Sequence, residues 1–191
     1  LLGSPLLRAD ILPKNFWVNP TFELGTDLDQ TTGTVSNWNR GGNDPTICQV
    51  ITNNSVSSGH SLAAIDSTAG DLYGEWYSDV MLGGQAYGGD TLDIQWYEMY
   101  NLNGPEMRLT VLFFNAADSV IGQTHFVTSG STSAGWVSSI EDSTFTQRNG
   151  SLSVPLGAVK MRFSLVSGGS GTLTGVMIIG DLSVARAPVP N

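Results

Sequence analysis

The sequence contains little charge and almost no lysine. Lys and Arg number 8 and Asp and Glu number 17, so charged residues make up 13% of the 191 residues, about half of the usual share of about 25%. The net charge of −9 leaves no basic surface for the counterion release that drives nucleic-acid binding. Good helix formers never accumulate over a helical window, so long surface helices are not expected. Nucleic acid and anionic membranes are therefore not expected partners.

Cysteine and long apolar runs are scarce as well. Cys48 is the only cysteine, so it has no partner for an intramolecular disulfide, and no cluster of Cys or His surrounds it to bind zinc. We expect it to be a small buried apolar residue. No apolar run approaches the roughly 20 residues that a helix needs to span a bilayer. Residues 1–9 (LLGSPLLRA) resemble the end of a signal peptide, so we expect a secreted, extracellular protein.

Short strand-like runs dominate what is present. From Phe16 onward, runs of β-branched and aromatic residues alternate with clusters of Gly, Asn, Asp, Ser and Pro, a pattern typical of an antiparallel sandwich. We predict one all-β domain, an antiparallel β-sandwich, over 16–185, with an apolar N-terminal arm over 1–15 and a C-terminal linker over 186–191. A turn is expected at Asn149-Gly150. The clearest strands are expected at 47–52, 61–66, 91–100, 107–114, 159–166 and 173–184.

Three of these strands should each have one apolar and one polar face, because side chains alternate across a strand. In 91–100, for example, Leu92, Ile94 and Trp96 share the apolar face. If the three strands are neighbours in one sheet, their polar faces merge into a single platform. This predicted platform consists of Asp93, Gln95, Tyr97, Arg108, Thr110, Arg162 and Ser164.

Several motifs resemble those of a known family. Residues 19–23 (NPTFE), followed by Gly25 and Trp38, resemble the NPGFE…W opening of the jelly-roll carbohydrate-binding modules that bind xylan and β-glucan. Later segments resemble the same group in the same order: 59–62 (GHSL), 154–157 (VPLG) and 178–184 (IIGDLSV). Thr21 and Gly180 depart from the family pattern, which usually has Gly and Asp there. The resemblance implies a jelly-roll sandwich that binds carbohydrate.

The same resemblance implies a structural Ca²⁺ site. The resembling modules hold Ca²⁺ between their first and last strands, and oxygen ligands suit this ion. Glu23 and Asp181 are the matching carboxylates, and carbonyl oxygens near Thr21 and Ser61 would complete the coordination shell. The alternative is that these carboxylates are salt-bridged or face the solvent.

No catalytic arrangement stands out in the sequence. Glycoside hydrolysis needs two carboxylates about 5 to 9.5 Å apart, but acidic pairs such as Asp27 with Asp29 lie in polar stretches typical of solvated loops. His60 and His125 are far apart in the sequence and lack a zinc-binding spacing. We therefore expect no enzyme activity.

Aromatic residues concentrate between positions 76 and 100. Sugar rings stack their C–H faces on Trp and Tyr, while Arg, Asp and Gln hydrogen-bond to the hydroxyls. We predict a non-catalytic module that binds a neutral polysaccharide on a sheet face, because an acidic protein repels a polyanion. Core packing is the alternative role for the large aromatic residues. The predicted ligand-binding residues are Tyr97, Asp93, Gln95, Arg108, Arg162, Trp76 and Tyr77.

An alternative function fits the same composition. Low charge, abundant Gly, Ser and Thr, and the apolar arm suit a structural subunit of an extracellular filament or surface layer. Copies of the chain would then assemble by donating residues 1–15 to a neighbour's sheet. The arm could instead form an extra edge strand on its own sandwich, with Pro5 and Pro13 limiting the pairing.

Overall fold

The computed structural model describes most of the predicted domain. Residues 1–14 and 189–191 lie outside the described part, so the predicted arm and linker boundaries stay predictions. The described residues are 15–57, 59–66, 73–103, 108–127, 133, 136–137, 139–140, 142–168 and 174–188.

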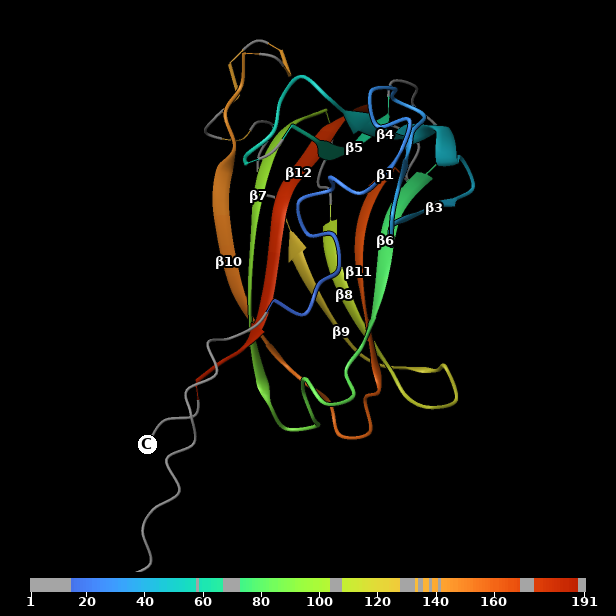
Figure 1. Cartoon of the computed structure of the whole chain (residues 1–191), viewed down its shortest axis with the longest axis vertical. Helices are drawn as coiled ribbons and strands as arrows, with labels where there is room; N and C mark the ends of the chain where they lie inside the picture. Colours follow the sequence, from blue (N-terminus) through green and yellow to red (C-terminus); the bar gives the residue numbers. More distant parts are fainter. Residues whose placement is uncertain are drawn as a thin grey trace, which may run out of the picture.

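Two five-stranded antiparallel sheets face each other (Figure 1). The first contains, in order, β10 (Thr146–Ser153), β7 (Thr91–Asn103), β12 (Thr174–Arg186), β5 (Ser61–Asp66) and β4 (Cys48–Ile51), and we call it the β12 sheet after its central strand. The second contains β3 (Asn39–Gly42), β6 (Tyr73–Met81), β11 (Lys160–Gly168), β8 (Arg108–Phe114) and β9 (Val120–Val127), and we call it the β11 sheet. A small hairpin of β1 (Gly25–Thr26) and β2 (Thr34–Val35) and a 3₁₀ turn, η1 (Pro45–Ile47), lie outside them. The predicted all-β, antiparallel sandwich is confirmed.

All six predicted strands are present, but the predicted turn at Asn149-Gly150 is wrong. Both residues lie within β10, paired with Gln95 and Ile94 of β7. Gly150 allows a close approach of the opposite sheet, because a Cβ there would lie 2.3 Å from the ring of Phe126. The glycine is therefore required by packing and not by a turn.

The core lies between the sheets, where the inward faces meet. As alternation predicted, Leu92, Ile94 and Trp96 are all buried. An aromatic cluster occupies its centre: Phe163 packs edge-on against Trp17 and Trp38, with ring centroids 5.5 and 6.0 Å away. The described residues contain no helix long and apolar enough to cross a membrane.

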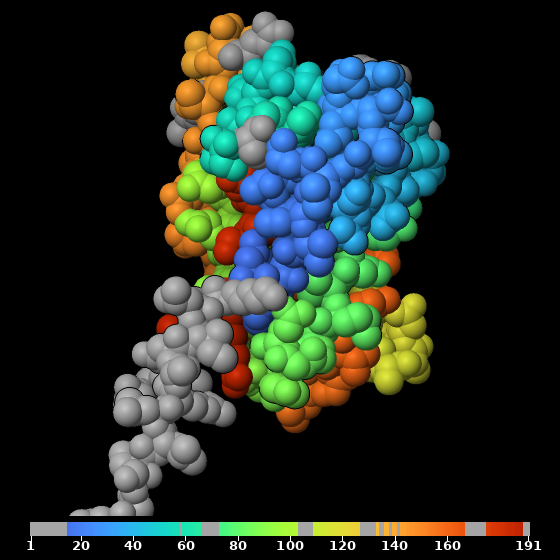
Figure 2. Space-filling view, viewed as in Figure 1, coloured from blue at the N-terminus to red at the C-terminus, as the bar shows by residue number. Residues whose placement is uncertain are grey.

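The start of the described chain adds to the edge of β12 beyond the end of β5. Phe16 donates its backbone N–H to the carbonyl of Val184 at 2.8 Å, and the Asn15 side chain donates to the carbonyl of Leu182 at 2.9 Å. Leu182 in turn donates to the carbonyl of Pro20 at 2.9 Å. Figure 2 shows this stretch, in blue, covering the near side of the molecule beside β12.

A second, smaller apolar cluster lies on the outward face of the β12 sheet. Ile51, Ala63, Met99 and Ile178 form its buried part. Ile65, Ile140, Phe145 and Val176 pack against them and are only partly buried. The outward face of these strands is therefore apolar as well, and the loop residues Ile140 and Phe145 cover part of it.

Candidate functional site

The structure does not bring the predicted polar platform together. β7, which carries Asp93, Gln95 and Tyr97, belongs to the β12 sheet, whereas Arg162 on β11 belongs to the β11 sheet. The two groups therefore lie on outward faces on opposite sides of the sandwich. Alternation fixes which side chains of a strand face outward, but not which sheet the strand joins. Arg108 is opposite Val166 of β11 in the register of β8, and its side chain lies outside the described part.

Trp76, one of the predicted ligand contacts, is a core residue. Its side chain is 1% exposed, and its indole N–H crosses between the sheets to donate to the carbonyl of Ala63 at 3.0 Å. The guanidinium of Arg40 lies 4.4 Å from the ring centroid. These contacts leave no face of Trp76 for a sugar, so this prediction is wrong. The neighbouring Tyr77 points the other way, onto the outward face.

The outward face of the β11 sheet carries a continuous polar row. The register of the five strands places Asn39, Tyr77, Ser164, Thr110 and His125 side by side. Ser164 donates to Glu75 at 2.5 Å, and Thr110 Oγ1 lies 2.9 Å from Nδ1 of His125. We call this surface the β11-sheet face.

Arg162 and Tyr77 form a fixed unit on the β11-sheet face. Arg162 donates from Nε and Nη2 to the two carboxylate oxygens of Asp79, at 2.6 and 2.9 Å, and its guanidinium lies 4.3 Å over the Tyr77 ring. The hydrogen bond to Asp79 raises the pKa of Arg162. Burial alone would raise the pKa of Asp79, but the hydrogen bonds and charges of Arg162 and Lys160 bring it below its ordinary value. The pair therefore stays ionised around neutral pH.

The second cation of this face is also neutralised. Lys160 lies 2.5 Å from Asp118 and 3.6 Å from Asp79, with its ammonium 4.3 Å over the Phe114 ring. Together with the Arg162–Asp79 pair, this arrangement leaves no described cation on the face without a carboxylate partner.

The outward face of the β12 sheet is a separate polar surface. Register places Gln147, Asn149 and Ser151 of β10 opposite Tyr97, Gln95 and Asp93, respectively. All three β10 residues and Asp93 are exposed, while Tyr97 and Gln95 are half-buried. Tyr97 thus has amide and hydroxyl neighbours instead of the arginines that the platform required.

The residues predicted to bind Ca²⁺ lie near the start of β5 and near the bulge in the middle of β12. Glu23 Oε1 accepts the backbone N–H of His60 at 3.1 Å and lies 2.9 Å from its Nδ1, and Ser61 follows directly. The loop before Thr21 reaches the last strand through the hydrogen bond from Leu182 to Pro20.

Asp181, the second carboxylate predicted to bind the ion, lies in an irregular part of β12. The register of β12 against β7 shifts between Gly180 and Leu182, so Asp181 occupies a bulge that redirects its side chain. Its Oδ1 atom is buried and has no hydrogen-bond partner, an arrangement that usually has a specific cause such as an ion. Among the residues that the structure describes, no group of three or more His, Cys, Asp or Glu side chains could hold a metal ion. The residues fit a calcium ion only if backbone carbonyls supply the remaining ligands.

Glu98 is a buried carboxylate that the sequence did not single out. It is 1% exposed and accepts hydrogen bonds from the Trp96 indole and from Arg148 Nη1, both at 2.8 Å. Burial raises its pKa above the ordinary 4.5, although the Trp96 hydrogen bond and the Arg148 charge oppose the shift. A raised pKa means that folding favours the protonated form, so the stability from this group is full at low pH and declines as the pH rises through the raised pKa.

Glu98→Gln is therefore expected to flatten the pH dependence of stability above pH 4.5. Each unit by which the pKa of Glu98 differs between the folded and unfolded states corresponds to about 1.4 kcal/mol of unfolding free energy. Urea unfolding at a series of pH values between 4 and 7 measures the effect, with the exposed Asp93→Asn as the control. A Glu98→Gln curve parallel to the wild type would contradict the raised pKa.

Comparison with known proteins establishes the fold. No family model matches the sequence, and no curated protein matches it. Among solved structures, the enzymatically active domain of tailspike protein 4 of bacteriophage CBA120 is similar, with a TM-score of 0.60 and 14% sequence identity. The match covers 91% of this chain but only 21% of the tailspike chain. Two further similar structures are single modules that this chain matches over nearly their whole length.

The first is TmCBM61, solved with β-1,4-galactotriose, with a TM-score of 0.55 and 13% identity over 91% of this chain and 99% of that one. The second is a family 16 carbohydrate-binding module, with a TM-score of 0.53 and 11% identity over 90% of this chain and 99% of that one. The chain shares its β-sandwich fold with these two modules and with the tailspike domain. At these identities the likeness shows the fold alone, and the closer resemblance to the NPGFE-type modules stays a prediction.

Proposed function

We propose that this protein is a secreted, non-catalytic module that binds a neutral polysaccharide on its β11-sheet face. The observation that carries the proposal is the row of polar and aromatic side chains across all five strands of that sheet, from Asn39 to His125. The fold shared with carbohydrate-binding modules supports it. The proposal moves the site away from Tyr97, since that residue lies on the opposite side of the sandwich.

Two tyrosines would provide the stacking surface, Tyr77 with the ring face that Arg162 does not cover. Tyr73 is 39% exposed and Tyr77 is half-buried, and both lie on the outward side of β6. Four residues of strand separate them by about 13 Å, a span that suits a chain of several sugar units. Asn39 and the Asp79–Arg162 pair supply donors and acceptors for hydroxyl groups, whereas Ser164 is buried and bonded to Glu75.

The charges of this face favour a neutral ligand. Arg162 and Lys160 are both occupied by carboxylates, so neither offers an unpaired positive charge to a uronic acid. The net charge of −9 adds long-range repulsion toward any polyanion. Binding should accordingly change little with ionic strength.

Tyr77→Ala is expected to weaken polysaccharide binding by about 1–3 kcal/mol, the scale of losing one stacked aromatic side chain. Titration calorimetry with neutral oligosaccharides of xylan, β-glucan and β-1,4-galactan measures it. Tyr97→Ala is the matched control and should leave the affinity unchanged. The reverse result would place the site on the β12 sheet, and no binding of any neutral glycan by the wild type would reject the proposal.

We also propose that a structural Ca²⁺ is held by Glu23 and Asp181 with carbonyl oxygens near Thr21 and Ser61. The buried, unpartnered Oδ1 of Asp181 supports this proposal. The ion would join the first loop to the last strand and to the start of β5, so its contribution would be to stability and not to the ligand face. Calcium would also give the buried Oδ1 of Asp181 a partner.

The filament alternative stays a prediction. It depends on the apolar arm, of which residues 1–14 lie outside the described part. Asn15 and Phe16, the arm-side residues that the structure does describe, bond to β12 of the same molecule. This contact favours packing within one chain at that point, and no described feature favours a filament over carbohydrate binding.

A further inference from the structure

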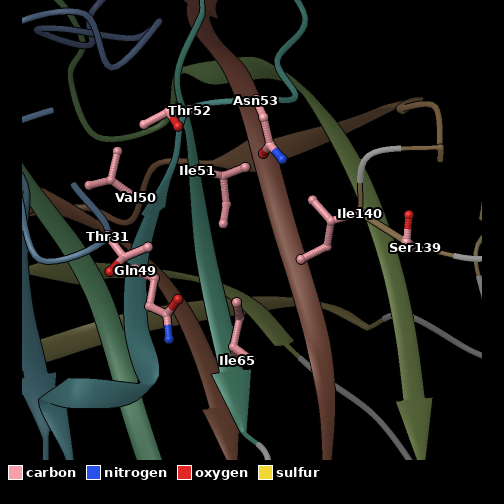
Figure 3. A pocket seen from close by; sticks show the side chains of 9 residues that line it. All are labelled: Thr31, Gln49, Val50, Ile51, Thr52, Asn53, Ile65, Ser139 and Ile140. Carbon is pink, nitrogen blue, oxygen red and sulfur yellow. The ribbon is translucent and has the colours of Figure 1, made fainter. Parts of the chain in front are cut away.

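We propose a second ligand site, for an uncharged acetamido sugar, on the outward face of the β12 sheet. A hollow of about 610 Å³ lies there over β4 and β5, within the range of about 300–1,000 Å³ typical of small-molecule sites. It belongs to the sheet opposite the β11-sheet face, so it does not rest on the polysaccharide site proposed above. The lining residues are Thr31, Gln49, Val50, Ile51, Thr52, Asn53, Ile65, Ser139 and Ile140 (Figure 3).

The walls of the hollow are apolar and uncharged. Ile51 and Ile65 come from the adjacent strands β4 and β5, and Ile140 comes from the loop on the other side (Figure 3). None of the nine lining residues is charged or aromatic. An ion would lose hydration there without a counter-charge, and a bare sugar ring would have no aromatic face on which to stack.

Polar side chains at the rim of the hollow supply hydrogen-bonding groups. Gln49 offers an amide donor and acceptor, and Thr52 offers a hydroxyl group. The Ser139 hydroxyl donates to Asp142 at 3.1 Å, so it is left to act as an acceptor. An acetamido group combines a methyl group, which suits the isoleucines, with an N–H and a C=O, which suit an amide side chain. The remaining hydroxyl groups of the sugar would lie at the rim. This combination suits an N-acetylated neutral sugar better than an unsubstituted one.

The loop wall is held in place by hydrogen bonds from outside the hollow. Asn54 donates from Nδ2 to the carbonyl of Ile140 and, at 2.8 Å, to that of Ser143. Ser143 donates from Oγ to the carbonyl of Ser139 at 2.6 Å and accepts the N–H of Val137 at 3.0 Å. Ile140 also packs on the external apolar cluster. A wall that is already ordered reduces the entropy lost when a ligand binds.

N-acetylglucosamine is the probe for this site, and glucose is its matched control without the acetamido group. NMR titration of the full chain is expected to show N-acetylglucosamine binding about tenfold tighter than glucose, from one buried methyl group and one added hydrogen bond. Chemical-shift changes should map to β4, β5 and residues 139–140. Equal affinities, or no binding of N-acetylglucosamine, would overturn the proposal.

Variants of the lining locate the site. Gln49→Ala and Ile140→Ser are each expected to weaken N-acetylglucosamine binding about three- to tenfold, since each removes one hydrogen bond or one apolar contact. Gln147→Ala removes an exposed amide from β10 of the same sheet and should bind like the wild type. Thermal melts check that each variant is folded. Undiminished binding in both folded lining variants would overturn the assignment, whatever the outcome for polysaccharide.

Discussion

A Phe163→Ala variant is expected to lose about 3–5 kcal/mol of unfolding free energy. Phe163 is fully buried at the centre of β11 and packs edge-on against Trp17 and Trp38. Removing its ring leaves a cavity between the β11 sheet and the N-terminal segment, which would relax only partly. Guanidinium unfolding followed by tryptophan fluorescence measures the change, because both tryptophans border the lost ring.

Phe163→Leu is the matched control and should cost clearly less, because leucine fills part of the same volume. A loss below about 1 kcal/mol for Phe163→Ala would contradict the central position of this residue, since such values are typical of exposed sites.

Calcium is expected to raise the unfolding free energy of chelator-treated protein by about 2.7 kcal/mol when its concentration is 100 times the dissociation constant. Asp181→Asn should remove most of this gain, because the substitution takes the half-buried carboxylate from the proposed coordination shell. Thermal melts with and without Ca²⁺ test it, with calorimetry to detect binding.

Asp93→Asn is the control for charge, because it neutralises an exposed Asp on the same sheet far from the bulge. Neither heat nor a melting shift with Ca²⁺ in the wild type would reject the calcium site. A full calcium response in Asp181→Asn would show that other oxygen atoms hold the ion.

The sequence predicted the faces of strands better than their neighbours. Leu92, Ile94 and Trp96 are buried as alternation indicated, because the period of two is a local property of the chain. The partner of a strand is set by long-range pairing, which a single sequence does not encode in any local pattern. The platform that joined Tyr97 to Arg162 therefore had correct outward-facing residues and an incorrect sheet assignment.

Adjacent aromatic residues caused a different error. Trp76 and Tyr77 were both predicted to contact ligand, but consecutive residues of a strand face opposite sides, so one of them had to be buried. The glycine at position 150 misled in a similar way, because its role depends on Phe126, a residue of the other sheet. The buried position of Glu98 was missed because charged residues are rarely buried, even where alternation places them on the inward face of a strand.

The path of the chain at β12 has a mechanical consequence. Phe16 bonds to Val184 at the edge of β12, two residues before that strand ends at Arg186. The points where the chain enters and leaves the sandwich are therefore neighbours. Tension applied between residues 15 and 186 would break the bonds of Asn15 and Phe16 one after another, as in unzipping, instead of loading many strand hydrogen bonds at once. The first segment would peel away at low force while the ten strands of the two sheets stayed paired.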